Sequence, residues 1–143
     1  MLIKQLSIFV ENKKGRMAEI TKTLAAHGID IRALSIADTT DYGILRLIVD
    51  DPEKAVLVLK EEHMTVSLTD VIAIAVPDVP GGLSRAVEVL ATEGVDIEYM
   101  YASLNAKNDS AFVILRVEDN EKAMSLLKAA RITLMSAEEL YNI

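Results

Sequence analysis

The apolar residues of the chain follow two spacings. Alternation with polar residues predicts strands, and the first half of the chain has four such segments, over residues 6–10, 31–37, 44–49 and 64–68. Apolar residues at helical spacing lie between them, from Met17 to Ala26 and from Ala55 to Leu59. The first half is therefore predicted to follow the order β-α-β-β-α-β.

Residues that favour helix ends mark the limits of the two predicted helices. Asp51 can cap the second helix, Pro52 suits its first position, and Glu53 places negative charge in its first turn. Gly28 follows the first helix, where a left-handed residue commonly ends a helix, and His27 suits the negative end of the helix dipole.

The second half of the chain repeats the first. At a shift of 66 positions, the matches are Ile8/Ile74, Val10/Val76, Gly15/Gly81, Leu24/Leu90, Ala25/Ala91, Gly28/Gly94, Asp30/Asp96 and Ile31/Ile97. At a shift of 68 they are Leu47/Leu115, Val49/Val117, Asp51/Asp119, Glu53/Glu121, Lys54/Lys122, Ala55/Ala123, Leu59/Leu127 and Lys60/Lys128. The slip falls among residues 38–43 and 105–110, where a hairpin loop tolerates insertion.

The repeat predicts two domains, residues 1–69 and 70–143, joined directly at Thr69 and Asp70. The second domain has predicted strands over residues 71–76, 97–103, 111–117 and 132–135. Its helices run from Leu83 to Gly94 and after the capping residue Asp119, and residues 136–139 resemble a capping box. The predicted fold class is α+β: two ferredoxin-like βαββαβ units, each an antiparallel sheet with its helices on one face. Such small units are expected to pack on each other.

The sheet face opposite the helices also carries apolar residues, namely Phe9, Ile44, Ile48, Phe112 and Ile114. Strands that are apolar on both sides favour coverage of both faces, here by a sister domain or a partner subunit. The alternative is scattered surface residues, which are common.

Composition excludes several function classes. A net charge of −7 with two Phe, four Tyr and no Trp argues against a nucleic-acid module. The absence of Cys excludes disulfides and thiolate metal sites. The sequence shows no signal peptide and no membrane span, which predicts a cytoplasmic protein. No cofactor is predicted, and no nucleophile elbow, phosphate loop or paired-His metal motif is present, so the protein is expected not to be an enzyme. His27 and His63 are interpreted as helix-end and surface residues.

The loops before the first helix of each unit are the candidate sites. Gly15 and Gly81 lie where a strand meets a helix, so backbone amides can approach an anion there. Asn12 and Asp78 occupy equivalent loop positions, and Asp30 and Asp96 follow the helices. Amide donors for a carboxylate, with oxygens for an ammonium, could recognise a free amino acid. The alternative is that both glycines are only turn residues and both aspartates only loop caps.

These residues resemble a known family, the ACT domain. The resemblance rests on residues 11–17, Leu24 and residues 28–31 in the first unit, and on residues 80–83, Leu90 and residues 94–97 in the second. It covers the whole chain as two ACT units and is similar to stand-alone tandem ACT proteins of bacteria. ACT domains are small-molecule sensors, most often of amino acids.

The resemblance implies ligand-binding residues in both units. In the family, an Asn in the first loop and an Asn after the helix contact the amino acid. Asn12 matches the first, whereas Asp30, Asp78 and Asp96 depart from the pattern, because Asp cannot donate an N–H to a carboxylate. Lys13, Lys14 and Arg16 could offset the added charge, so the Asn12 site is ranked above the Asp78 site. The remaining candidate ligand residues are Glu11, Met17, Ile31, Gly82, Leu83, Ile97, Tyr99 and Tyr101.

In the family the ligand lies between two domains, and Tyr99 and Tyr101 lie on a strand where such an interface would run. The alternative is that both tyrosines pack in an interface. The first hypothesis is a non-catalytic, amino-acid-binding regulatory protein, expected to form a homodimer. The alternative is a regulatory or scaffold subunit that binds a biosynthetic enzyme and whose ligand sites are degenerate.

Overall fold

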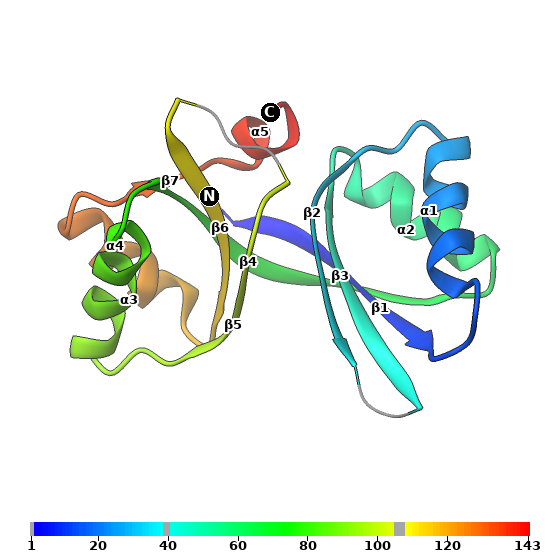
Figure 1. Ribbon diagram of the computed structural model, residues 1–143, viewed down its shortest axis with the longest axis horizontal. Helices are drawn as coiled ribbons and strands as arrows, with labels where there is room; N and C mark the ends of the chain where they lie inside the picture. The colour runs from blue at the N-terminus through cyan, green and yellow to red at the C-terminus, as the bar shows by residue number, and fades with distance from the viewer. Residues whose placement is uncertain (1, 39–40, 105–107) are drawn as a thin grey trace. The chain divides into compact units, whose positions relative to one another are not determined.

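The computed structural model describes residues 2–38, 41–104 and 108–143 (Figure 1). The chain divides into two compact units, which we call the N-terminal unit (residues 4–69) and the C-terminal unit (residues 70–143 together with Leu2 and Ile3). The hairpin segments in which the repeats differ in length include residues 39–40 and 105–107, which lie outside the described residues.

The N-terminal unit has the predicted β-α-β-β-α-β order. Its elements are β1 (Ile3–Glu11), α1 (Arg16–Ala26), β2 (Ile31–Asp38), β3 (Tyr42–Val49), α2 (Pro52–Glu61) and the first part of β4 (Thr65–Pro77). The strand order is β2-β3-β1-β4, and β3 pairs antiparallel with both β1 and β2. The predicted ferredoxin-like fold is thereby confirmed for this unit.

The C-terminal unit repeats the arrangement, with the second part of β4 as its first strand. The further elements are α3 (Gly82–Thr92), β5 (Ile97–Ala102), β6 (Ser110–Val117), α4 (Asn120–Ala129), β7 (Thr133–Leu134) and α5 (Ala137–Tyr141). The order is β7-β4-β6-β5, with antiparallel pairing throughout. Both units therefore place their first strand in the middle of the sheet, next to the third and fourth.

A single strand, β4, joins the two repeats. The sequence predicts two strands that meet at Thr69 and Asp70, but both residues lie inside β4, which runs unbroken from Thr65 to Pro77. No Gly or Pro interrupts the segment before Pro77, and it is rich in β-branched residues, which favour an extended backbone.

The predicted helix starts are confirmed. The Asp51 carboxylate accepts a hydrogen bond from the Lys54 backbone N–H at 3.1 Å, and Pro52 is the first residue of α2. The equivalent Asp119 accepts from the Lys122 N–H at 3.0 Å at the start of α4. Each bond satisfies one of the amides that a helix leaves without an internal partner.

Each unit has its own hydrophobic core between its two repeat helices and one face of its sheet. In the N-terminal unit the fully buried side chains include Leu6, Ile8, Ile20, Leu24, Leu45, Leu47 and Leu59. In the C-terminal unit they include Ile72, Ile74, Leu90, Leu115, Val117, Ala123 and Leu127. Leu2 packs against the C-terminal core, which explains why the start of the chain groups with that unit.

The short helix α5 adds a feature to the C-terminal unit. The predicted capping box is present: the Glu139 N–H donates to the Ser136 hydroxyl at 3.1 Å, and the Ser136 N–H donates to the Glu139 carboxylate at 2.8 Å. Ala75 and Phe112, on the sheet face opposite α3 and α4, line the same hollow as Glu138, Glu139 and Asn142. The C-terminal unit therefore has a third helix on its other face.

The apolar residues expected on the opposite sheet faces differ in exposure. Phe112 is 8% exposed and Ile114 is fully buried, whereas Phe9 keeps 47% of its surface exposed. Phe9 stacks on Tyr42, with 4.8 Å between ring centroids. The coverage of this face by a partner subunit stays a prediction.

Candidate functional site

The loop between β1 and α1 is built around Gly15. Its φ of 83° and ψ of −5° place it in the left-handed region, which residues with a Cβ rarely adopt. A Cβ at this position would meet no atom within 4 Å, so the backbone angle and not crowding favours glycine. The Asn12 N–H donates to the Asp41 carbonyl at 2.9 Å, which holds the loop against the β2–β3 hairpin.

The loop between β4 and α3 has the same backbone bonds. The Asp78 N–H donates to the Asp109 carbonyl at 2.8 Å, and Gly81 has φ 87° and ψ −9°. Neither α1 nor α3 has a side-chain cap at its start. At each helix start no N-cap side chain therefore satisfies the first backbone amides, and such amides favour an anion.

The side chains of the first loop largely pair with one another. Lys13 lies 2.7 Å from the Glu11 carboxylate, and the hydrogen bond from Lys13, followed by its charge, lowers the pKa of Glu11. Arg16 lies 2.9 Å from the Glu19 carboxylate. Two of the three cations expected to offset the acidic replacements are thus already paired with carboxylates, and Lys14 is exposed.

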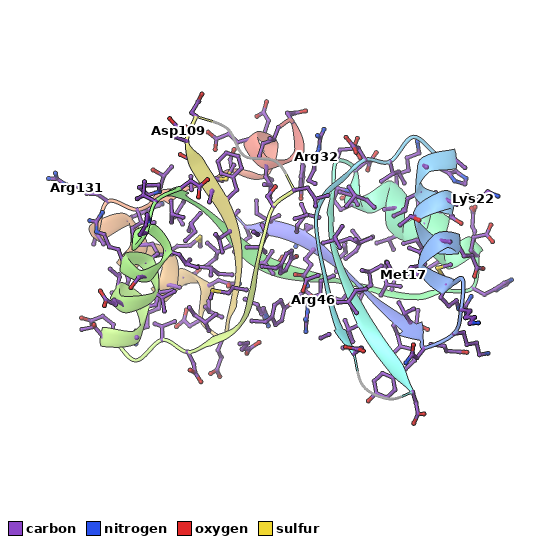
Figure 2. All side chains as sticks on the ribbon, in the orientation of Figure 1. Met17, Lys22, Arg32, Arg46, Asp109 and Arg131 are labelled. Atoms are coloured by element: carbon purple, nitrogen blue, oxygen red, sulfur yellow. The ribbon has the colours of Figure 1, made fainter. Side chains whose placement is uncertain are left out.

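The two loops differ most at the first helical position, which is Arg16 in α1 and Gly82 in α3. A Cβ at Gly82 would come within 2.1 Å of the Pro77 carbonyl oxygen. Because that atom is backbone, the close approach requires glycine. The next residues, Met17 and Leu83, both pack against the core of their own unit, and Figure 2 shows Met17 at the start of α1.

Asp30 and Ile31 lie at the far end of α1. Since α1 has 11 residues, the helix separates them from the loop by roughly 16 Å at 1.5 Å per residue. The Asp30 carboxylate lies 3.2 Å from Arg32, and its N–H donates to Asp50 at 2.9 Å, while Ile31 packs against the core. Within one unit, the structure does not bring Asp30 together with Asn12.

The equivalent residues of the C-terminal unit behave similarly. Asp96 is exposed in the turn before β5, and Ile97 packs against the core. They follow α3, whereas Asp78 and Gly81 precede it.

Tyr99 and Tyr101 lie on β5 with their rings stacked, 6.5 Å between centroids. A register shift between Ile97 and Tyr99 places Tyr99 opposite Arg116 of β6. Arg116 points to the face opposite Leu115 and Val117, which belong to the core. Both tyrosines therefore lie on the face away from α3, and the unit does not bring them together with Gly81.

A pocket of about 180 Å³ adjoins the first loop. It brings together the predicted residues Glu11, Asn12, Arg16 and Met17 with Lys13, one of the cations expected to offset the charge. It adds residues that the sequence reasoning missed, namely Val10, Ile36, Asp38, Gly43 and Leu45. Asp38 and Gly43 flank the β2–β3 hairpin, so the hydrogen bond from Asn12 to Asp41 accounts for their proximity. The contribution of Asp38 and Gly43 to the pocket becomes visible only in the folded structure.

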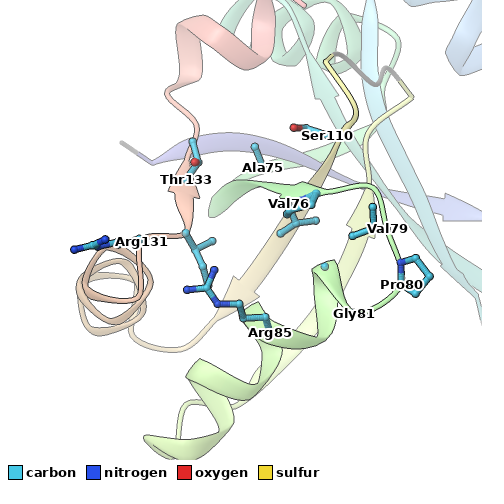
Figure 3. Close-up of a pocket in the computed structure, with 12 residues that line it drawn as sticks. Ala75, Val76, Val79, Pro80, Gly81, Arg85, Ser110, Arg131 and Thr133 are labelled. Carbon is cyan, nitrogen blue, oxygen red and sulfur yellow. The ribbon is translucent and has the colours of Figure 1, made fainter.

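The second loop adjoins a larger pocket of about 480 Å³ on its other side, toward the α4–β7 turn (Figure 3). The predicted residues Gly81 and Gly82 line it, whereas Asp78 and Leu83 do not. Arg85, Arg131 and Thr133 were missed. Aligning the repeats puts Arg85 at the position of Glu19, and this reversal of charge is a signal that the sequence does contain.

Within the described ranges, no group of three or more His, Asp or Glu side chains could hold a metal ion. None of the helices described has the length and apolar character needed to span a bilayer.

Comparisons with known proteins agree with this architecture. The family model described as an ACT domain pair matches residues 1–143. A crystal structure of protein BT0572 from Bacteroides thetaiotaomicron has a TM-score of 0.94 and 46% sequence identity, covering 100% of this chain and 98% of that one. The regulatory subunit of aspartate kinase from Thermus thermophilus, in its ligand-free form, has a TM-score of 0.63 and 17% identity, covering 89% of this chain and 91% of that one.

The corresponding subunit from Thermus flavus has a TM-score of 0.64 and 16% identity, with 90% of each chain covered. At these low identities, the two aspartate kinase subunits show a shared fold. No curated protein matches the sequence. The match over the full length shows that the chain belongs to the ACT domain pair family.

Proposed function

We propose that this chain is a non-catalytic regulatory protein that binds a free amino acid at the loop before α1. One observation carries the proposal: Asn12 and the first residues of α1, Arg16 and Met17, line one pocket, and α1 begins after a left-handed glycine without a side-chain cap. Backbone amides at a helix start bind carboxylates, and the Asn12 amide can donate a further hydrogen bond.

The pocket walls fit the other parts of an amino acid. Glu11 and Asp38 supply carboxylates for an ammonium group, and Met17, Ile36 and Leu45 form an apolar wall for a side chain. At about 180 Å³, the pocket lies below the roughly 300–1,000 Å³ of sites for drug-sized ligands. It suits a small ligand, completed by a facing domain of a second copy in a homodimer.

Regulation follows if the ligand binds one arrangement of domains more tightly than another. The ligand then shifts the population by the ratio of its two affinities. This regulatory role is what membership of the ACT family supports, and a cytoplasmic location is part of the same proposal.

A thermal-shift panel of the twenty amino acids tests the proposal. A ligand at 100 times its Kd adds about 2.7 kcal/mol to stability, so one chemical class should raise the Tm by several degrees. Asn12→Ala should remove the shift, while Asp78→Ala serves as the matched control in the other loop. A flat panel at millimolar concentrations would exclude the amino-acid site.

A second candidate is a regulatory subunit that binds a biosynthetic enzyme and has degenerate ligand sites. The pairing of Asp30 with Arg32 and of Lys13 with Glu11 favours it, because these groups are already engaged. The exposed apolar side chains Phe9, Ile36 and Tyr42 could contact a partner. A stoichiometric enzyme recovered with the tagged protein from native lysate would support this alternative, and its absence would weaken it.

A further inference from the structure

The pocket beside the second loop has walls unlike those of the first. Its apolar side chains include Val76, Val79, Pro80 and Ile132, and Ser110 and Thr133 add hydroxyl groups. Its charged lining residues are Arg85 and Arg131, and no Asp or Glu lines it. In a chain with a net charge of −7, this pocket is locally cationic.

In the N-terminal unit, larger side chains fill most of the space that corresponds to this pocket. The corresponding hollow there measures only about 70 Å³, compared with about 480 Å³ in the C-terminal unit. Three positions change from large to small between the repeats, namely Phe9 to Ala75, Arg16 to Gly82 and Ile20 to Ala86. Loss of these side chains opens the pocket without a change in the fold.

The charge in this space is reversed as well. In the N-terminal unit, Glu19 pairs with Arg16 at 2.9 Å. The C-terminal unit has Arg85 in place of Glu19, and its guanidinium donates one hydrogen bond, to the Ala130 carbonyl at 2.7 Å. Arg85 forms no ion pair with any residue that the structure describes, so its other N–H groups can bind an anion.

The two arginines of the pocket have different orientations. In Figure 3, the Arg85 side chain extends from α3 toward the turn before β7, whereas that of Arg131 points away from the other labelled lining residues. Figure 2 likewise shows Arg131 at the periphery of the C-terminal unit. Arg85 is therefore the cation placed for a ligand.

We propose that this pocket binds a small organic carboxylate that has an apolar chain and lacks an ammonium group, such as a 2-oxo acid. Arg85 binds the carboxylate, and Val76, Val79 and Ile132 contact the chain. An α-amino acid is disfavoured, because its ammonium would lie beside Arg85 with no acidic side chain in the lining. The site is separate from the Asn12 pocket and does not depend on the proposed function.

Calorimetric titration of the full-length protein with 4-methyl-2-oxopentanoate and with L-leucine tests the proposal, since the two probes differ only at the α-carbon. We expect the oxo acid to bind at one site per chain. Arg85→Met should weaken this binding about tenfold or more, because a charge-assisted hydrogen bond is lost. Arg131→Met, the matched control, should leave it within about twofold.

A second variant, Val79→Asp, places a carboxylate at the pocket mouth. Val79 is 62% exposed, so this variant should fold, and it should weaken binding of the oxo acid by a similar factor. Asn12→Ala should not affect the oxo acid, whereas it should remove any leucine binding at the first loop. The proposal is overturned if the oxo acid does not bind at millimolar concentration or if Arg85→Met leaves its affinity unchanged. Leucine binding that is equally tight and depends on Arg85 would also overturn it.

Discussion

The Arg16 guanidinium lies 2.9 Å from the Glu19 carboxylate, one turn along the same helix. The same two positions in the second repeat hold Gly82 and Arg85. The first repeat thus has a neutralised ion pair at these two positions. The second repeat has an open, cationic pocket there. An internal repeat makes this comparison possible within one molecule, with the backbone of the loop nearly constant.

Gly15, in the loop before α1, and Gly82, the first residue of α3, should respond differently to alanine. Gly15→Ala should cost about 1–2 kcal/mol in the free energy of unfolding, since only the left-handed backbone angle is penalised. Gly82→Ala should cost more, because its Cβ would come within 2.1 Å of the Pro77 carbonyl oxygen. Urea unfolding of both variants measures the difference. A smaller loss for Gly82→Ala than for Gly15→Ala would contradict the described loop.

The carboxylate caps of α2 and α4 should contribute equally in the two units. Asp51→Ala and Asp119→Ala should each lower the free energy of unfolding by about 1 kcal/mol, because each leaves a helix amide unsatisfied. Asp51→Asn and Asp119→Asn keep an acceptor and should lose little. Chemical denaturation measures both pairs, and equal losses for Ala and Asn would show that the bond itself contributes nothing.

The capping box of α5 should make the stability of the fold depend on pH in the acidic range. Hydrogen bonds from the Ser136 backbone and then its side chain lower the pKa of Glu139 below its ordinary value of 4.5. A lowered folded-state pKa stabilises the fold above the unfolded value, and this contribution is lost as pH falls through the folded value. Glu139→Gln should therefore flatten the decline in stability below about pH 4.5.

An NMR titration of the Glu139 carboxyl group checks the cause. Its midpoint should rise toward the ordinary value in Ser136→Ala, because that variant removes the serine side-chain hydrogen bond that contributes to the lowered pKa. An unchanged midpoint would mean that Ser136 does not stabilise the ionised carboxylate.

Core truncation should be costly at equivalent positions of both repeats. Leu24→Ala and Leu90→Ala each remove a fully buried side chain and should lower the free energy of unfolding by about 2–5 kcal/mol. Leu57, which is 66% exposed on α2, is the control and should change stability by less than about 0.5 kcal/mol. Comparable losses for Leu57→Ala and Leu24→Ala would contradict the assignment of the core.

Much of the fold could be predicted because its signals are local. Asp51, Pro52 and Gly28 act on their own helix ends, and the repeat gives two independent readings of each element. The continuity of β4 was missed because the repeat places a boundary at Thr69 and Asp70, although no residue there breaks a strand. Sequence similarity between repeats marks the copies and not the ends of the elements.

The candidate site was less accessible to sequence reasoning. The residues of the first loop were found because they are neighbours in the chain. Strand pairing brings Ile36 and Thr133 to the pockets. Arg85 reaches its pocket from the first turn of α3. The position of Tyr99 depends on the register shift between Ile97 and Tyr99, which reverses the sheet face that Tyr99 occupies. No residue pattern in the sequence predicts this shift.

The contact of Leu2 with the C-terminal core has a consequence for how such proteins can be divided and recombined. A fragment that begins at Asp70 would retain the second repeat but lack Leu2, a partly buried apolar side chain that packs against its core. The reverse fragment would end within a β-strand. Neither fragment therefore keeps all the contacts of its unit. A domain exchange between relatives would have to carry the first residues of the chain along with the second repeat.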